Sequence, residues 1–316
     1  MRSGVPRRRW LAACASLLAG CSSSGGASPT TTPAASSVEA TSTVASTTTV
    51  PAGVFADVEA LAAELSAVEA GIRAEGVSAE ELAALGRRQQ LAYRAMNRHD
   101  EWQSTLLALV DPVAQAPLRY HIAARQFSIA HSAGKPATDP PAVLPAWTII
   151  EPLPVEQLRS YYPEAEAATG VPWQYLAAIH FQETRMGRVV GVSSAGAVGP
   201  MQFLPTTWAI CCEGDPLDTR DAILGAARYL VAHGAPGDME AALNAYNPNS
   251  AYVGAVTAYA QNMQADERAY LGYHGWQVFY GTSVGTVRLP VGYSATNEVD
   301  AAEYVRTHPA DVVPIT

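Results

Sequence analysis

The chain has 316 residues, of which 48% are hydrophobic and 16% are charged, and its formal net charge is −9 at pH 7. An acidic balance of this size, without a basic cluster or an aromatic stacking motif, makes the chain a poor candidate for nucleic-acid binding.

The first residues have the features of a secretory signal peptide. Arg2 and Arg7-Arg8-Arg9 precede an apolar stretch over residues 10–19, which is far shorter than the roughly 20 residues that a membrane-spanning helix needs. Leu18-Ala19-Gly20-Cys21 follows and resembles the lipobox of bacterial lipoproteins, in which cleavage precedes a cysteine that carries diacylglycerol. We therefore expect residues 1–20 to be a signal peptide and Cys21 to be lipidated. An ordinary cleavage site with an incidental Cys21 is the alternative.

Residues 21–53 are almost entirely small, polar or proline residues. They cannot bury enough apolar area to offset chain entropy, so we expect a disordered tether. A tether of about 30 residues spans a root-mean-square distance of roughly 30 Å and can stretch to about 100 Å. Loss of residues 1–20 would remove four arginines and no acid, which takes the net charge from −9 to about −13.

The remaining cysteines agree with export. Cys14 would leave with the signal peptide and Cys21 would be lipidated, which leaves the neighbours Cys211 and Cys212. Adjacent Cα atoms are about 3.8 Å apart, short of the usual disulfide range. Cys211 and Cys212 could therefore form a strained vicinal disulfide or remain as two thiols.

Residues 54–134 are predicted to form a small antiparallel helical bundle. Leu61, Leu65, Val68 and Ile72 recur at steps of four, three and four residues, and Ser78-x-x-Glu81 has the form of a capping box. Breaks are expected near Gly76, Asp100 and Asp111-Pro112. The role of this bundle as a spacer or docking domain is the plainest interpretation, and the proline-rich residues 135–147 are expected to be a stiff linker.

Residues 148–290 are predicted to be a second, mainly α unit with a small β-hairpin. The hairpin is expected over 276–289, and its aromatic residues could line a cleft or form the hairpin's own core. A tail over 291–316 carries a short helix near 298–306. The expected helices of the unit cover residues 154–168, 172–185, 205–210, 219–233, 238–245 and 250–271.

A glutamate lies on an apolar helix face in this unit. Leu176, Ile179 and Glu183 recur at offsets of three and four, so they share one face. The plain interpretation is a helix end at which Glu183 turns to water or pairs with Arg185 or Arg188. The functional interpretation is an acid whose pKa is raised by dry surroundings, as glycosidic bond cleavage requires.

The segment from Ser193 to Trp208 favours the functional interpretation. Gly196 and Gly199 permit tight turns, and two prolines fix φ. Gln202 is the one long amide side chain of the run, able to donate and to accept hydrogen bonds. Met201, Phe203, Leu204 and Trp208 are expected to anchor the turn in a core.

These residues resemble the bacterial lytic transglycosylases, which belong to the lysozyme-like superfamily and are similar to goose-type lysozyme. That family combines a helix-borne catalytic glutamate with a Ser-x-x-Gly-Ala-x-Gly-x-Met-Gln-x-x-Pro-x-Thr turn, which residues 193–207 reproduce, and with an Ala-Tyr-Asn motif, found here at 245–247. The chain departs from many relatives at Thr184, where they have Ser, in lacking an Asn-Pro pair after it, and in a longer loop before Ser193.

The resemblance implies a lysozyme-like α-helical domain and a lyase that acts on the glycan strands of peptidoglycan. Glu183 would be the catalytic acid, and Ser193 and Gln202 would contact it or the sugar. Tyr246 would lie close to the scissile linkage and Asn247 would brace the cleft. The protein would be anchored through Cys21 on the outer face of the cell membrane, facing the cell wall. The sequence names no protein partner.

No cofactor or metal is implied. Asp215, Asp218 and Asp221 lack the order of a calcium loop, and Asp218 and Asp221 are expected to begin a helix. Two rival functions stay open. A lysozyme-type hydrolase would need a second carboxylate, for which Asp215 and Asp218 are candidates, and a non-catalytic peptidoglycan-binding lipoprotein would keep the fold as a scaffold.

Overall fold

The computed structural model describes residues 53–314. The predicted signal peptide over 1–20, the lipidation at Cys21 and the predicted tether as far as residue 52 lie outside the described residues, and they stay predictions. Between residues 53 and 314, no helix is both long and apolar enough to cross a membrane.

Helices dominate the first region, as predicted. Asp57 caps the first helix by accepting a hydrogen bond from the backbone N–H of Ala60. Ser78 and Glu81 form the predicted capping box at the start of the second helix, which satisfies backbone donors that the first turn leaves unpaired. The elements of this region are α1 (Val58–Arg73), α2 (Ala79–Met96), η2 (Asp100–Trp102), α3 (Gln103–Leu109) and α4 (Pro112–Ser132).

The second region is also helical. The starts of its helices agree with the predicted ones to within a few residues, because prolines or capping aspartates precede most of them; Asp218, for example, accepts from the backbone N–H of Asp221. The elements are α5 (Val155–Thr169), α6 (Trp173–Thr184), α7 (Pro205–Cys211), α8 (Thr219–Ala232), α9 (Met239–Tyr246), α10 (Ser250–Ala265) and α11 (Ala269–His274).

The single helix predicted over 250–271 is wrong, because the chain breaks at Asp266. This residue has extended backbone, and its carboxylate accepts a hydrogen bond of 2.9 Å from the backbone N–H of Arg268. Aspartate competes in this way with helical hydrogen bonding. The other carboxylate oxygen accepts from Nε of Arg73 at 2.5 Å, so the break also ties α1 to the second region.

The β-structure consists of short antiparallel pairs. The predicted hairpin is confirmed: β4 (Val278–Thr282) pairs with β5 (Gly285–Leu289). The proline-rich linker carries β1 (Val143–Leu144), which pairs with β6 (Val299–Asp300) of the tail, and β2 (Thr148–Ile149) pairs with β3 (Val189–Val190). Helix α12 (Ala301–Thr307) and η3 (Pro309–Asp311) follow β6. The predicted helix near 298–306 therefore starts later, because residues 299–300 pair as a strand.

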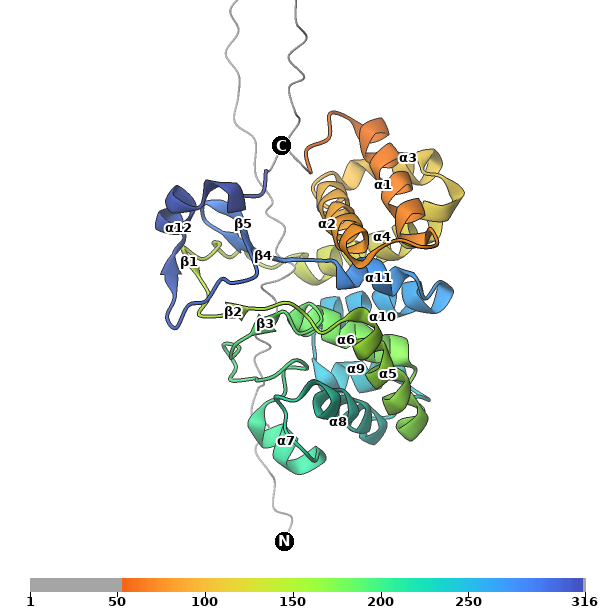
Figure 1. Ribbon diagram of the computed structural model, residues 1–316, viewed down its shortest axis with the longest axis vertical. Coiled ribbons are helices and arrows are strands. Elements are labelled where there is room, and N and C mark those ends of the chain that lie inside the picture. Colours follow the sequence, from red (N-terminus) through yellow and green to blue (C-terminus); the bar gives the residue numbers. More distant parts are fainter. Residues whose placement is uncertain (1–52, 315–316) are drawn as a thin grey trace, which may run out of the picture.

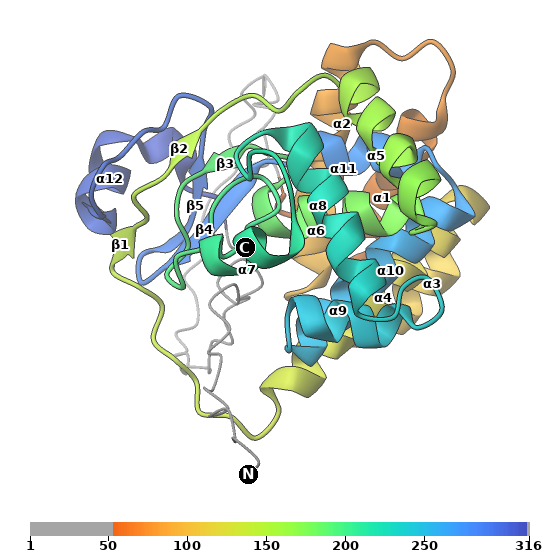
Figure 2. The ribbon, with the colours of Figure 1, turned by 90° about the horizontal axis from the view of Figure 1, so that it is seen from below.

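The mainly α fold with a small hairpin is confirmed, and Figure 1 shows the β-structure and α12 set to one side of the helices. The helices of both regions share one hydrophobic cluster, in which α4 packs along α10 (Figure 2). A smaller cluster, with Leu144, Val278 and Leu289 among its members, holds the β-structure together.

The two helical regions also touch backbone to backbone. A Cβ atom added at Gly86 of α2 would lie 2.5 Å from the carbonyl oxygen of Gly272 and 2.7 Å from the Cα of Gly275. Beside this contact, the fully buried carboxylate of Glu69 accepts hydrogen bonds from the Tyr93 hydroxyl at 2.6 Å and from the Gln89 amide at 2.9 Å. Buried polar groups that are satisfied in this way specify one arrangement of the helices.

Candidate active site

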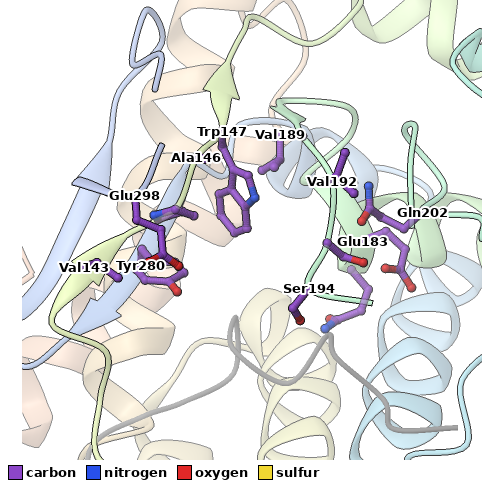
Figure 3. A pocket seen from close by; sticks show the side chains of 14 residues that line it. Val143, Ala146, Trp147, Glu183, Val189, Val192, Ser194, Gln202, Tyr280 and Glu298 are labelled. Atoms are coloured by element: carbon purple, nitrogen blue, oxygen red, sulfur yellow. The ribbon is translucent and has the colours of Figure 1, made fainter. Parts of the chain in front are cut away.

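A cleft of about 310 Å³ lies between the helical side and the β-structure. Glu183, Ser193 and Gln202, three of the predicted site residues, line it together. We call these three residues the inner wall. Figure 3 shows Trp147, Tyr280 and Glu298 across the cleft from Glu183 and Gln202, and we call this set the outer wall. The other lining residues are Val143, Pro145, Ala146, Gln182, Val189, Gly191, Val192 and Ser194.

Helix α6 carries Glu183 through the middle of the protein. All of its residues except Gln174 are buried, and Glu183 itself is 8% exposed. The glutamate therefore does not turn outward to water, which was the plain interpretation of its position. Arg188, one of its two suggested partners, pairs with Glu151 at 3.1 Å.

The chain reverses directly after Glu183. Arg185, Met186 and Gly187 have φ values of 54°, 61° and 84°, in the left-handed region that residues with side chains seldom adopt. Thr184 fixes this reversal, since its hydroxyl donates to the carbonyl of Pro200 at 2.7 Å and accepts from the backbone N–H of Gly187 at 3.1 Å. The substitution of Ser by Thr relative to many transglycosylases thus keeps a hydroxyl that joins α6 to the glycine-rich turn.

The glycine-rich turn is closed by its own hydrogen bonds. The hydroxyl of Ser193 accepts from the backbone N–H of Ala197 at 3.0 Å, and Val198 and Phe203 form an antiparallel bridge. Between them Gln202, with φ of 50°, donates its side-chain amide to the carbonyl of Gly199 at 2.9 Å. Ser193 and Gln202 are thereby held beside Glu183 in the cleft wall.

Gly199 is required by its surroundings. It has φ of 76°, and an added Cβ atom would lie 2.0 Å from the carbonyl oxygen of Pro216. Gly196 also has a positive φ, of 83°, but an added Cβ atom there would meet nothing within 4 Å. Only Gly199 is therefore demanded by packing as well as by backbone conformation.

Buried apolar and aromatic side chains hold the glycine-rich turn in place. Met201, Phe203 and Trp208 are buried as predicted, whereas Leu204 is half-buried. The hydroxyl of Tyr246 donates to the carbonyl of Met201 at 2.6 Å, and its ring lies 5.6 Å from that of Phe203.

Tyr246 and Asn247 are not among the residues that line the cleft, and the predicted bracing of the cleft by Asn247 stays a prediction. Asn247 is buried, and its Oδ1 has no hydrogen-bond partner among the described residues. The predicted position of Tyr246 close to the scissile linkage stays a prediction.

Two buried basic residues, His180 and Arg185, lie close to Glu183 in the sequence. Burial, with a smaller effect of His274, lowers the pKa of His180 to about 3, so this histidine is neutral at pH 7. The Tyr162 hydroxyl and Nδ1 of His180 are 2.8 Å apart. Burial also lowers the pKa of Arg185, whose guanidinium lies 4.6 Å from the centre of the Phe181 ring and donates to the Phe181 carbonyl.

Sequence reasoning did not assign Trp147, Glu298 or Gln182 to the site, and it left the place of Tyr280 open. Trp147 was assigned to the end of a linker and Glu298 to an uninformative tail. The pairing of β1 with β6 and the hydrogen bond from the backbone N–H of Ala295 to the Trp147 carbonyl bring those segments together. Tyr280 was weighed as a cleft residue or a hairpin core residue, and it lines the cleft. Gln182 is 3% exposed, and its Oε1 has no hydrogen-bond partner among the described residues. Its place next to Glu183 was the one available signal.

The acidic residues before α8 have structural roles. Asp218 caps α8, and Asp215 accepts a hydrogen bond from the backbone N–H of Leu217 at 2.9 Å. Neither lines the cleft. Within residues 53–314, no group of three or more His, Cys, Asp or Glu side chains is arranged to hold a metal ion.

The end of α7 carries a vicinal disulfide between Cys211 and Cys212. Of the two states that the sequence left open, this is the one that the structure has.

Comparison with known proteins gives one partial relative. The "Membrane-bound lytic murein transglycosylase F" of Thiobacillus denitrificans (strain ATCC 25259 / T1) is 37% identical to this chain over 79 residues. The match covers 25% of this chain and 17% of the length of that relative. No family model matches the chain, and no solved structure matches it.

Proposed function

We propose that the protein is a lytic transglycosylase that cleaves the β-1,4 linkage between N-acetylmuramic acid and N-acetylglucosamine in peptidoglycan and leaves 1,6-anhydro ends. One observation carries the proposal: Glu183 is buried at the end of α6, yet it lines a cleft together with Ser193 and Gln202. The partial similarity to a lytic murein transglycosylase supports the same activity.

Glu183 acts first as an acid and then as a base. It gives its proton to the bridging oxygen as an oxocarbenium-like state develops on the muramic acid ring. The ionised glutamate next takes the proton from the 6-hydroxyl of that same sugar, whose oxygen closes the 1,6-anhydro ring. Attack from within the sugar has a high effective molarity, so a single carboxylate suffices.

Polar side chains that line the cleft would contact the sugar. By resemblance to the family, the N-acetyl group of the substrate assists the departure of the leaving group, and Ser193 and Gln202 position the ring. Gln182 lies next to Glu183 in the lining of the cleft, and its buried Oε1 has no hydrogen-bond partner among the described residues.

A lysozyme-type hydrolase is the second candidate, and Glu298 is the observation that favours it. Hydrolysis needs a further carboxylate to activate water. Asp215 and Asp218 do not line the cleft, whereas Glu298 does. The two reactions give different products, because hydrolysis adds water to the new chain end and transglycosylation does not.

Digestion of purified peptidoglycan in heavy-oxygen water separates these functions. A transglycosylase yields ends that resist borohydride and carry no label. Reducible, labelled ends as the main product would replace the proposal by hydrolysis. Binding to peptidoglycan without soluble products would indicate the non-catalytic alternative.

The proposed place of action is the outer face of the cell membrane. Cys21→Ala should abolish labelling by a clickable fatty acid and release the protein from the membrane fraction, because a lipid at Cys21 is the proposed anchor. Membrane retention equal to that of the unaltered protein would contradict the proposed anchor and leave the proposed reaction untouched.

A further inference from the structure

The outer wall is an aromatic corner closed by a carboxylate. The rings of Trp147 and Tyr280 meet edge to face, with their centres 5.6 Å apart. Gly191 lies against Trp147, since an added Cβ atom there would be 2.5 Å from the Trp147 Cδ1. The indole is thereby held between a backbone and a second ring, with part of its surface left in the cleft (Figure 3).

The carboxylate of Glu298 completes this corner. Glu298 is exposed, and within residues 53–314 no hydrogen bond or ion pair joins its side chain to another residue. The charge of Glu298 acts on a neighbouring residue of the cleft. Burial, and to a smaller extent the negative charge of Glu298, raises the pKa of Tyr280. An acceptor that the protein does not pair with a donor of its own is available to a ligand.

The charges of the cleft define the ligand. Glu183 and Glu298 are the charged residues among those that line it, and no Arg, Lys or His side chain belongs to that set. An anionic group placed next to Glu298 would be repelled by its charge. A neutral sugar could stack on the rings and donate a hydroxyl hydrogen bond to Glu298, but it would leave the negative charge of Glu298 uncompensated. A cation satisfies both the carboxylate and the aromatic faces, which attract ammonium groups through their quadrupoles.

We propose that the outer wall binds a primary ammonium group of the peptidoglycan substrate and so favours glycan that carries a free amine near the cleavage point. This inference rests on the proposed function, because it takes peptidoglycan as the ligand of the cleft. The amine has two chemical sources: an amino sugar that has lost its acetyl group, or the free amine of a diamino acid in a stem peptide.

Binding measurements test the proposal without requiring turnover. The full chain, carrying Glu183→Gln so that the ligand survives, is titrated with soluble glycan strands in matched pairs. One pair compares peptide-free strands with the same strands after partial removal of acetyl groups. The other compares strands bearing stem peptides with free amines and the same strands after acetylation of those amines.

An exposed cation–π contact together with an ion pair predicts that the amine-bearing member of at least one pair binds about 3- to 10-fold more tightly. Adding Glu298→Gln should reduce this ratio to about 1. Glu75→Gln, which removes the same charge from an exposed turn residue outside the cleft, should leave the ratio unchanged. Tyr280→Phe should keep most of the preference and Tyr280→Leu should lose part of it.

The pair that shows the preference identifies the source of the amine. Equal binding within both pairs would overturn the proposal, and so would a preference that survives Glu298→Gln. Failure of the proposed function has a different signature: the unaltered chain would release no 1,6-anhydro products from any strand, whereas the ratio of binding constants and its loss with Glu298→Gln would still be measured.

Discussion

The two walls of the cleft are built in opposite ways. The inner wall is fixed from several directions: Thr184 joins α6 to the turn, Tyr246 joins the turn to α9, and Ser193 closes the turn on itself. The outer wall is assembled from segments far apart in the chain and depends on one aromatic pair and one exposed carboxylate. Under the proposed function, the inner wall would place the reacting atoms, which demands precision, and the outer wall would recognise substrate, which does not.

The largest effect is expected at the inner wall. Glu183→Gln keeps the size and hydrogen bonding of the side chain but removes its transferable proton. Release of anhydro products should therefore fall by about 10² or more, the scale of general acid catalysis, with little change in the unfolding midpoint. Full activity in this variant would show that Glu183 is not the catalytic acid. The proposed difference in function between the two walls would then be wrong.

Next in size is the pair of glycine substitutions. Gly199→Ala forces a Cβ atom against the carbonyl oxygen of Pro216 at a positive φ, so it should cost about 2–4 kcal/mol of unfolding free energy through overpacking and backbone strain. Gly196→Ala has the same backbone conformation but free space, and it should cost about 1 kcal/mol. Chemical denaturation of both variants measures the difference, and equal losses would show that packing at Gly199 contributes nothing.

Acid should lower the unfolding free energy through two histidines that are buried among the helices. His121 and His180, both buried there, have pKa values lowered to about 3 by burial, against about 6.5 in the unfolded chain. The stabilisation from keeping each neutral is therefore complete above pH 6.5 and is lost as the pH falls from 6.5 towards 3, at up to about 1.4 kcal/mol per pH unit for each histidine.

Urea unfolding between pH 7 and pH 5 measures that loss. His180→Gln should reduce the pH dependence, and His233→Gln, at an exposed position, should not. A dependence that is unchanged in His180→Gln would mean that His180 is charged or solvated in the folded protein.

The smallest effect is expected at the outer wall. Trp147→Ala removes the edge-to-face contact with Tyr280, worth about 1 kcal/mol, and should raise KM by about 5-fold with kcat nearly unchanged. Trp147→Phe should restore most of the loss. A large fall in kcat would contradict the view that this wall recognises substrate without placing the reacting atoms.

The residues of the inner wall could be predicted from the sequence, whereas the assembly of the outer wall could not. Glu183, Ser193 and Gln202 come from neighbouring segments whose turn chemistry is local, so their meeting in one cleft could be expected from motif spacing. The left-handed backbone at Arg185 and Met186 depends on the hydroxyl of Thr184 and the carbonyl of Pro200, a tertiary contact with no local signature. The outer wall requires β1 to pair with β6 across the whole second region, and two-residue strands leave no periodic pattern to recognise.

The backbone contact of Gly86 with Gly272 and Gly275 affects whether the second region can fold as a separate fragment. A fragment that begins after the proline-rich linker would leave α10 and α11 without α2 and α4, so we expect it to expose apolar surface and aggregate. The sequence similarity to the transglycosylase relative extends over only 79 residues, whereas the shared hydrophobic cluster extends through both helical regions. Substitutions in the core of the N-terminal helices are therefore expected to destabilise the second region as well.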